Sequence, residues 1–321
     1  GHLLRSGGHW TPDERAVAST VWMGGVFHSS LTQGHASANR CLSTQRGHLG
    51  LFRALGLRVL VDAGQGWQLL DLPSAWQLGT ARATWVYQCS GQRITVVADA
   101  APDAPTVGLS LQVDGGAPLA VLVSHHLAFN GSDTDDGLSP SAVAWEAAPG
   151  STPQALDVHL RPAAGGAMAA RFDSGGLRLQ ARSDGAPMQW RDDGALFVDG
   201  RSRGLPYLCL QTGPLRTLRL QLGCDLVPPG APADGRTVLD GGPQPAALHW
   251  QLPAGGAAAS DLGRLADWMP WLAHNALVHY LVPRGLEQFS GGGWGTRDVC
   301  QGPAELLLAL GRHDALRDLL C

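Results

Sequence analysis

The sequence contains no lysine, so all 23 of its basic residues are arginines. The 321 residues carry a formal net charge of -4, and the arginines are scattered along the chain. Nucleic acids and anionic membrane surfaces are bound by clustered positive charge. The composition therefore argues against DNA, RNA or a membrane surface as a partner.

Long apolar runs and paired cysteines are also missing. No window approaches the roughly 18 to 20 apolar residues of a membrane span, and the N-terminus lacks the layout of a signal peptide. The six cysteines are spread along the chain without Cys-x-x-Cys pairs, at Cys41, Cys89, Cys209, Cys224, Cys300 and Cys321. This spacing predicts reduced thiols, with neither a disulfide framework nor a zinc site. We therefore expect a soluble, cytoplasmic protein.

The first two thirds of the chain has the sequence signals of short strands and tight turns. Runs with alternating or β-branched apolar residues occur at 57–61, 84–87, 94–97, 107–113, 119–123, 156–160, 177–181, 195–198 and 215–222. Turn signals such as Asp-Gly-Gly and Ser-Asp-Gly separate them, which favours an antiparallel sandwich over βαβ units. None of the glycine-rich turns has the strand–G-x-G-x-x-G–helix context of a dinucleotide site.

The composition divides the chain into a β domain at 1–226, a Pro/Gly/Ala-rich linker at 227–260 and a helical segment at 261–321. Ser260 and Asp261 can cap a first helix, Pro270 suits the start of a second, and Pro303 opens a third with a leucine stripe. The last helix either packs on the sandwich or belongs to a helical barrel. Because the chain starts without Met and ends within a leucine-rich pattern, we expect a piece of a longer protein.

A glycine-rich polar loop at 284–302 is the strongest candidate site. Trp294 offers a flat apolar face to a sugar ring, while Arg297 and Gln301 can serve its hydroxyls. Asp298, if desolvated by the apolar surroundings, can donate a proton to a glycosidic oxygen; alternatively, an Arg297–Asp298 pair only pins the loop. Glu287 is the one carboxylate close enough in sequence to serve as a second acid/base or, with Gln288, to bind substrate; alternatively, it pairs with Arg284 at the end of a helix.

Histidines elsewhere offer weaker candidates. His125 and His126, with Asp133, Asp135 and Asp136 nearby, could hold a metal, but adjacent residues of a strand point to opposite faces. Ser124 beside His125 lacks the G-x-S-x-G elbow of a hydrolase triad. His28 and His35 either line a site or satisfy buried backbone groups. We therefore predict no metal site.

The segment from Met269 to Tyr280, followed by RGLEQFSGGGWGTRDVCQGPAELLLALGR, resembles the start of the catalytic (α/α)6 barrel of glycoside hydrolase family 94. That family includes cellobiose and chitobiose phosphorylases and the phosphorylase-like domain of cyclic β-1,2-glucan synthases. Motifs such as VWMGGVFHSS and LVSHH resemble the super-sandwich that precedes the barrel. Thr296 stands where the family commonly has an aromatic residue, and Gly302 where it has a second Asp.

The resemblance implies an N-terminal antiparallel β-super-sandwich at 1–226, like a carbohydrate-binding domain, followed by the first helices of a truncated (α/α)6 barrel at 261–321. It places the general acid on Asp298, with inorganic phosphate as co-substrate and an oligosaccharide or disaccharide as substrate, and it calls for no metal or organic cofactor. Phosphate contacts are expected after Cys321, so residues 1–321 alone should be inactive. A homodimer is expected for the full-length protein.

Two other functions are compatible with the same sequence. An inverting glycoside hydrolase on the same fold would need a second carboxylate to activate water. A non-catalytic carbohydrate-binding fragment would bind a β-disaccharide without turning it over. Dependence of turnover on phosphate separates the first from a phosphorylase.

Overall fold

The structure is a computed structural model of the chain, and it describes chiefly the β domain. The described residues are 17–19, 30–33, 36–37, 41–42, 44–46, 53–71, 73–78, 82–89, 91–100, 106–127, 143–162, 177–224 and seven residues between 304 and 317. The predicted linker at 227–260 lies outside them. The seven residues after 303 are too few to test the predicted barrel.

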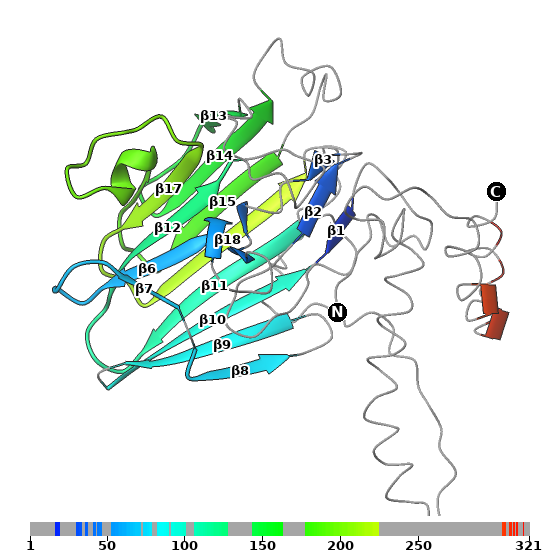
Figure 1. The fold of residues 1–321 in the computed structure, drawn as a ribbon, viewed down its shortest axis with the longest axis horizontal. Helices are drawn as coiled ribbons and strands as arrows, with labels where there is room; N and C mark the ends of the chain where they lie inside the picture. The colour runs from blue at the N-terminus through cyan, green and yellow to red at the C-terminus, as the bar shows by residue number, and fades with distance from the viewer. Residues whose placement is uncertain are drawn as a thin grey trace, which may run out of the picture.

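Two antiparallel sheets form the main body (Figure 1). The larger has eight strands, in the order β13 (Val143–Ala147), β14 (Ala155–Pro162), β15 (Leu177–Ser183), β18 (Thr217–Cys224), β11 (Thr106–Asp114), β10 (Gln92–Ala100), β9 (Arg82–Cys89) and β8 (Ala75–Leu78). The smaller has five, in the order β16 (Met188–Arg191), β17 (Tyr207–Thr212), β12 (Ala120–His126), β6 (Arg58–Asp62) and β7 (Gln68–Leu69). This arrangement confirms the predicted β-sandwich.

Two smaller sheets precede them in the chain. One joins β1 (Val17–Ser19), β2 (Ser30–Gln33) and β3 (Ala36–Ser37), and the other joins β4 (Thr44–Arg46) to β5 (Arg53–Gly56). None of the helices among the described residues has the length and apolar character that crossing a membrane requires.

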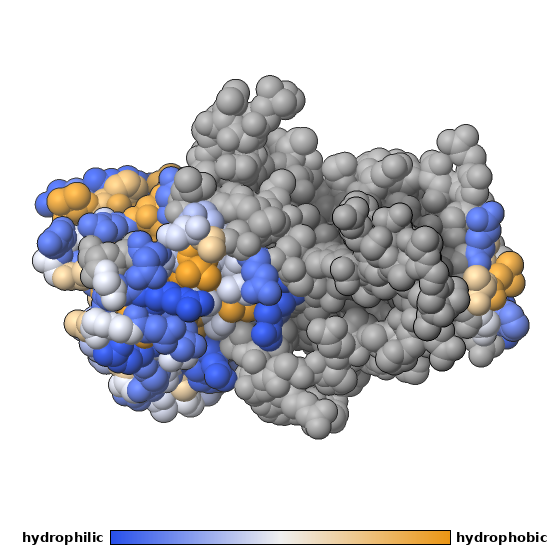
Figure 2. Space-filling model, turned by 90° about the horizontal axis from the view of Figure 1, so that it is seen from below, coloured by the Kyte–Doolittle hydropathy of each residue, from blue (hydrophilic) through white to orange (hydrophobic). Residues whose placement is uncertain are grey.

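The sandwich core lies between the two sheets. In β10, Ile94, Val96 and Ala98 are at most 1% exposed, and they face Val113, Leu111 and Leu109 of β11 in register. The facing sheet contributes matching apolar side chains: Val59, Val61, Val121, Val123, Leu208 and Leu210. Since burying one such side chain contributes about 1.5–3 kcal/mol, this shared core is the main source of stability. In the space-filling view, hydrophilic residues predominate over the described part of the surface (Figure 2).

One predicted strand, at 195–198, is wrong. The chain there forms a 3-10 helix, η3 (Asp193–Leu196), and Phe197 follows it as the C-cap. The side chain of Asp192 accepts a hydrogen bond from the backbone N–H of Gly194 at 3.0 Å, which favours a helical turn over an extended chain. A short apolar run carries no information about this cap, and its periodicity alone could not separate the two structures.

The turn between β11 and β12 is fastened by two side chains from other parts of the chain. Arg216 donates to the carbonyl oxygens of Gly115 at 3.3 Å and Gly116 at 2.8 Å, and Gln92 donates to that of Ala117 at 2.5 Å. Gly115 and Gly116 have φ of 72° and 52°. A Cβ on Gly116 would lie 2.5 Å from Cγ of Gln92, so a larger residue here would displace the Gln92 side chain as well as strain the backbone.

The core makes a direct stability prediction. Trp85 on β9 is fully buried at 0% exposure, so Trp85→Ala should lower the free energy of unfolding by about 3–5 kcal/mol through lost contacts and a cavity. Chemical denaturation measures this. Gln88→Ala, at an exposed position of the same strand, should change stability by less than about 0.5 kcal/mol. Equal losses of stability in the two variants would contradict the assignment of Trp85 to the buried face of β9 and of Gln88 to its exposed face.

Candidate functional site

The six residues predicted to act on substrate lie outside the described residues: Glu287, Gln288, Trp294, Arg297, Asp298 and Gln301. The structure therefore neither brings them together nor separates them. His28, His35, Asp133, Asp135 and Asp136 also lie outside the described residues. The polar groups of interest that the structure does describe fall into three places.

The first place is the end of β12, where two histidines are buried on opposite faces. His125 is in register with Leu208, whose side chain belongs to the core, and its Nδ1 lies 2.5 Å from the carbonyl oxygen of Cys41. Its ring meets that of Trp190 edge-on, with the centroids 5.9 Å apart. Because a carbonyl oxygen only accepts, Nδ1 carries the proton.

Burial lowers the pKa of His125 to about 4, although the hydrogen bond to Cys41 opposes the shift. The imidazole is therefore neutral at physiological pH. With 0% exposure it does not reach a ligand in solvent. His125 is a structural residue that joins β12 to the segment around Cys41.

His126 points to the other face of the sheet, where its ring lies 5.2 Å from that of Tyr207. It shares that face with Ser124 and Cys209, and all three are 0% exposed. The two imidazoles thus diverge, as the period-two alternation of a strand requires. Among the described residues there is no group of three or more side chains suited to hold a metal. Cys41 and Cys209 are free thiols, and burial raises the pKa of each to about 12.

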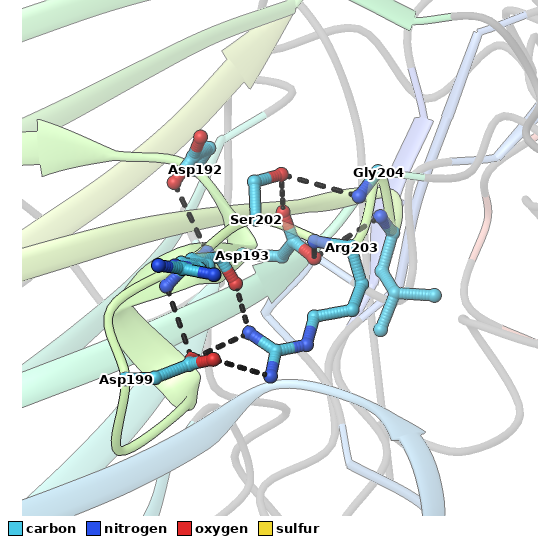
Figure 3. A network of polar contacts seen from close by, with 9 residues as sticks. Asp192, Asp193, Asp199, Ser202, Arg203 and Gly204 are labelled. Carbon is cyan, nitrogen blue, oxygen red and sulfur yellow. Dashed lines mark hydrogen bonds and ion pairs between the residues drawn. The ribbon is translucent and has the colours of Figure 1, made fainter.

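The second place is the loop between β16 and β17, residues 192–206, which we call the Asp193 loop (Figure 3). The carboxylate of Asp193 is 1% exposed and accepts hydrogen bonds from the Ser202 hydroxyl and from the backbone N–H groups of Arg203 at 2.8 Å and Leu205 at 3.2 Å. The buried Asp193 side chain, near the start of the loop, thereby holds the residues near its end.

Burial alone would raise the pKa of Asp193, but these donors stabilise the charged form and the net effect is a lowered pKa. A carboxylate that is ionised and fully occupied by donors does not serve as a general acid. Asp193 is therefore a structural anchor, which the sequence signals only as an Asp-Asp-Gly turn.

The same loop holds an arginine in a fixed position. Arg203 lies 4.0 Å above the Phe197 ring and donates to both carboxylate oxygens of Asp199, at 2.7 Å and 3.0 Å. A bidentate pair combined with a cation–π contact restricts the guanidinium to one orientation. Val198, at the tip, is fully exposed. The loop is thus a preformed projection from the sandwich rather than a reactive centre.

The third place is the outer face of the eight-stranded sheet, where Asp99 is 2% exposed. Its carboxylate lies 3.6 Å from Arg82, which is in register on β9. Burial raises the pKa of Asp99 to about 7, and the attraction of Arg82 counters only part of this. A carboxyl with a pKa near neutrality can hold or release a proton. Neither its burial nor this pKa could be predicted from sequence.

Residues 1–142 match the family model of the glycoside phosphorylase supersandwich domain. Along the chain, 311 residues are 27% identical to a 1,2-beta-oligoglucan phosphorylase of Listeria innocua serovar 6a; the alignment covers 96% of this chain and 27% of that protein. The chain thus spans about a quarter of the length of this curated relative. The predicted resemblance to glycoside phosphorylases is confirmed, and the two-sheet sandwich is consistent with the supersandwich domain.

Among solved structures, a polysaccharide lyase gives a TM-score of 0.38 at 11% identity, over 65% of this chain and 32% of the other. At that score the likeness supports no statement about function.

The Asp193 loop yields a pH-dependent prediction. The pKa of Asp193 is lowered by folding, so its contribution to stability is present above the unfolded value of about 3.9 and is lost as pH falls through the folded pKa. Asp193→Asn should lower the free energy of unfolding by about 1–3 kcal/mol at pH 7, because the amide nitrogen faces backbone donors. The difference from wild type, measured by urea denaturation, should shrink as the pH falls below the unfolded value and through the folded pKa.

The matched control is Asp199→Asn on the same loop. Asp199 is exposed, and its pair with Arg203 is open to solvent, so its loss should change stability little. A larger effect at Asp199 than at Asp193 would show that the surface pair, and not the buried carboxylate, holds the loop.

Proposed function

We propose that this chain is part of an inverting glycoside phosphorylase of the glycoside hydrolase family 94 type. The observation that carries the proposal is the 27% identity to a 1,2-beta-oligoglucan phosphorylase, because it extends over 96% of the chain and not only over the 1–142 supersandwich match. The sandwich would support the predicted barrel, whose first helices would follow at 261–321.

The proposed reaction needs one carboxyl group from the protein. Asp298 would give its proton to the glycosidic oxygen as the bond from that oxygen to the anomeric carbon breaks. An oxygen of inorganic phosphate would attack the anomeric carbon from the opposite face, so that a β-glycoside yields an α-sugar-1-phosphate. Phosphate is already a nucleophile and needs no base, in contrast to the water used by an inverting hydrolase.

The remaining residues of the glycine-rich loop would bind the sugar. Trp294 would cover one face of a pyranose ring, and Arg297, Gln301, Glu287 and Gln288 would hydrogen-bond its hydroxyls. The apolar surroundings would also disfavour the charged form of Asp298 and keep it protonated at neutral pH. By analogy with the relative, we propose β-1,2-linked glucose oligomers as the substrate class, with no organic cofactor.

Phosphate dependence is the most direct test of the reaction type. The full-length protein should release glucose-1-phosphate from β-1,2-linked oligomers only when inorganic phosphate is present. Phosphate-independent release of free glucose would identify a hydrolase. Binding of oligomers without turnover at any phosphate concentration would identify a carbohydrate-binding protein.

The role of Asp298 is tested by Asp298→Asn in the full-length protein. The amide is nearly isosteric but cannot donate a carboxyl proton, so kcat should fall by about 10²- to 10⁴-fold while KM changes little. A glycosyl fluoride donor in the synthetic direction needs less acid assistance and should lose less activity. Phosphorolysis and thermal melting are measured on the same sample.

Glu287→Gln is the matched control, because it neutralises the other carboxylate of the loop. It should affect KM more than kcat. If Asp298 only pins the loop through Arg297, Asp298→Asn would instead lower the melting temperature, and activity would fall with the folded fraction. Unchanged melting with near-normal activity on disaccharides would remove Asp298 from the mechanism.

A further inference from the structure

The hairpin that joins β6 to β7 has a rigid tip. One carboxylate oxygen of Asp62 accepts hydrogen bonds from the backbone N–H groups of Gly64 at 2.6 Å and Gly66 at 2.9 Å. Both glycines have positive φ, 93° and 95°, and nothing lies within 4 Å of a Cβ built on either. They are thus needed for backbone conformation rather than for space. The hairpin is preorganised and projects from the edge of the five-stranded sheet (Figure 1).

An apolar row runs along the sheet to this hairpin. Leu122, Leu60 and Leu69 are in register across β12, β6 and β7, on the face opposite the core. Exposure rises outward, from 2% at Leu122 to 42% at Leu69 at the edge. Trp67, two residues before Leu69, is 37% exposed. We call Trp67, Leu69 and the turn before them the Trp67 hairpin.

Apart from the Asp62 carboxylate, which accepts from the N–H groups of Gly64 and Gly66, the polar side chains near Trp67 in sequence are uncharged. Gln65 and Gln68 flank it and are exposed, and no charged side chain occurs between Ala63 and Leu70. A flat aromatic surface bordered by amides fits a ligand with apolar C–H faces and many hydroxyl groups. That combination describes a pyranose ring.

Other occupants fit the hairpin less well. An anionic polymer or membrane surface would require cations, which the hairpin lacks. β7 has only two residues, Gln68–Leu69, which is short for the addition of a partner strand. A neutral oligosaccharide requires neither cations nor a long strand edge.

We propose that the Trp67 hairpin is a carbohydrate-binding surface that holds a neutral β-glucan chain with one sugar ring stacked on the Trp67 indole. The choice of a glucan rests on the proposed function, whereas the aromatic surface rests on the geometry of the hairpin alone. Such a surface would retain a polymeric substrate on the protein independently of the glycine-rich loop.

Trp145 provides a matched control. It is 38% exposed, nearly the same as Trp67, but it lies within the edge strand β13, in register with the core residue Leu160, and not on a projecting hairpin. If exposure of an indole were enough, both tryptophans would bind glucan equally. The proposal requires that only Trp67 does.

The experiment is affinity electrophoresis of the full-length protein in native gels that contain soluble β-1,2-glucan. All variants carry Asp298→Asn, so that the polymer is not consumed. Trp67→Ala should weaken glucan binding at least about tenfold, as loss of an aromatic anchor does, whereas Trp145→Ala should stay within about twofold of the parent. Trp67→Phe should keep most of the binding and Trp67→Leu should not, because leucine has no flat ring.

Circular dichroism and thermal melting establish that each variant is folded; if Trp67→Ala is not, the Phe and Leu variants carry the comparison. Equal retardation of Trp67→Ala and the parent would overturn the proposal. So would equal losses in the two alanine variants, no retardation of the parent by β-1,2-, β-1,3- or β-1,4-glucan, or dissociation of an oligomer by Trp67→Ala in size-exclusion chromatography. Phosphorolysis by the wild type is assayed separately, so failure of the proposed reaction is distinguishable from failure of this site.

Discussion

Burial of one face of each sheet against the other fixes the direction in which the polar side chains of the strands point. Because side chains alternate along a strand, placing Val121 and Val123 in the core forces His125 inward and His126 outward. The same alternation places Asp99 on the outer face of β10, directly after the inward-facing Ala98. A shift of one residue in either strand would turn polar groups such as His126 or Asp99 toward the core and apolar groups away from it. The register of the strands is thus specified because any other register would be less stable.

Local pattern was enough to predict most strands but not their partners. The runs at 94–97 and 107–113 form β10 and β11, and a short connection makes them neighbours, as expected for an antiparallel pair. By contrast, β12 pairs with β17, where Leu122 meets Gln211, and β11 pairs with β18. Such distant pairings are decided by the packing of the whole sandwich, to which a single strand's pattern contributes little. The failure at 195–198 has a local cause, because the Asp192 cap outweighs the β-forming tendency of the apolar residues.

The glycine-rich loop could be identified from sequence, whereas the buried carboxyl groups of the sandwich could not. The glycine-rich loop stands out in sequence because its tryptophan, glycines and charged residues are contiguous, and its resemblance to a phosphorylase barrel assigns a role to Asp298. Asp193 and Asp99 do not stand out, since their properties depend on what surrounds them. Asp193 meets donors from residues nine to twelve positions later, and its pKa falls. Asp99 meets one arginine and little solvent, and its pKa rises. Two aspartates with the same intrinsic chemistry thus acquire opposite protonation behaviour.

The fastening of the β11–β12 turn by Arg216 and Gln92 bears on how the protein can be altered. Arg216 stands just before β18 and Gln92 at the start of β10, so the turn ties together three segments that are distant in sequence. A peptide tag, a spectroscopic label or a longer loop inserted at 115–117 would separate the carbonyl groups that these side chains hold. Insertions for labelling the sandwich therefore belong away from the 115–117 turn.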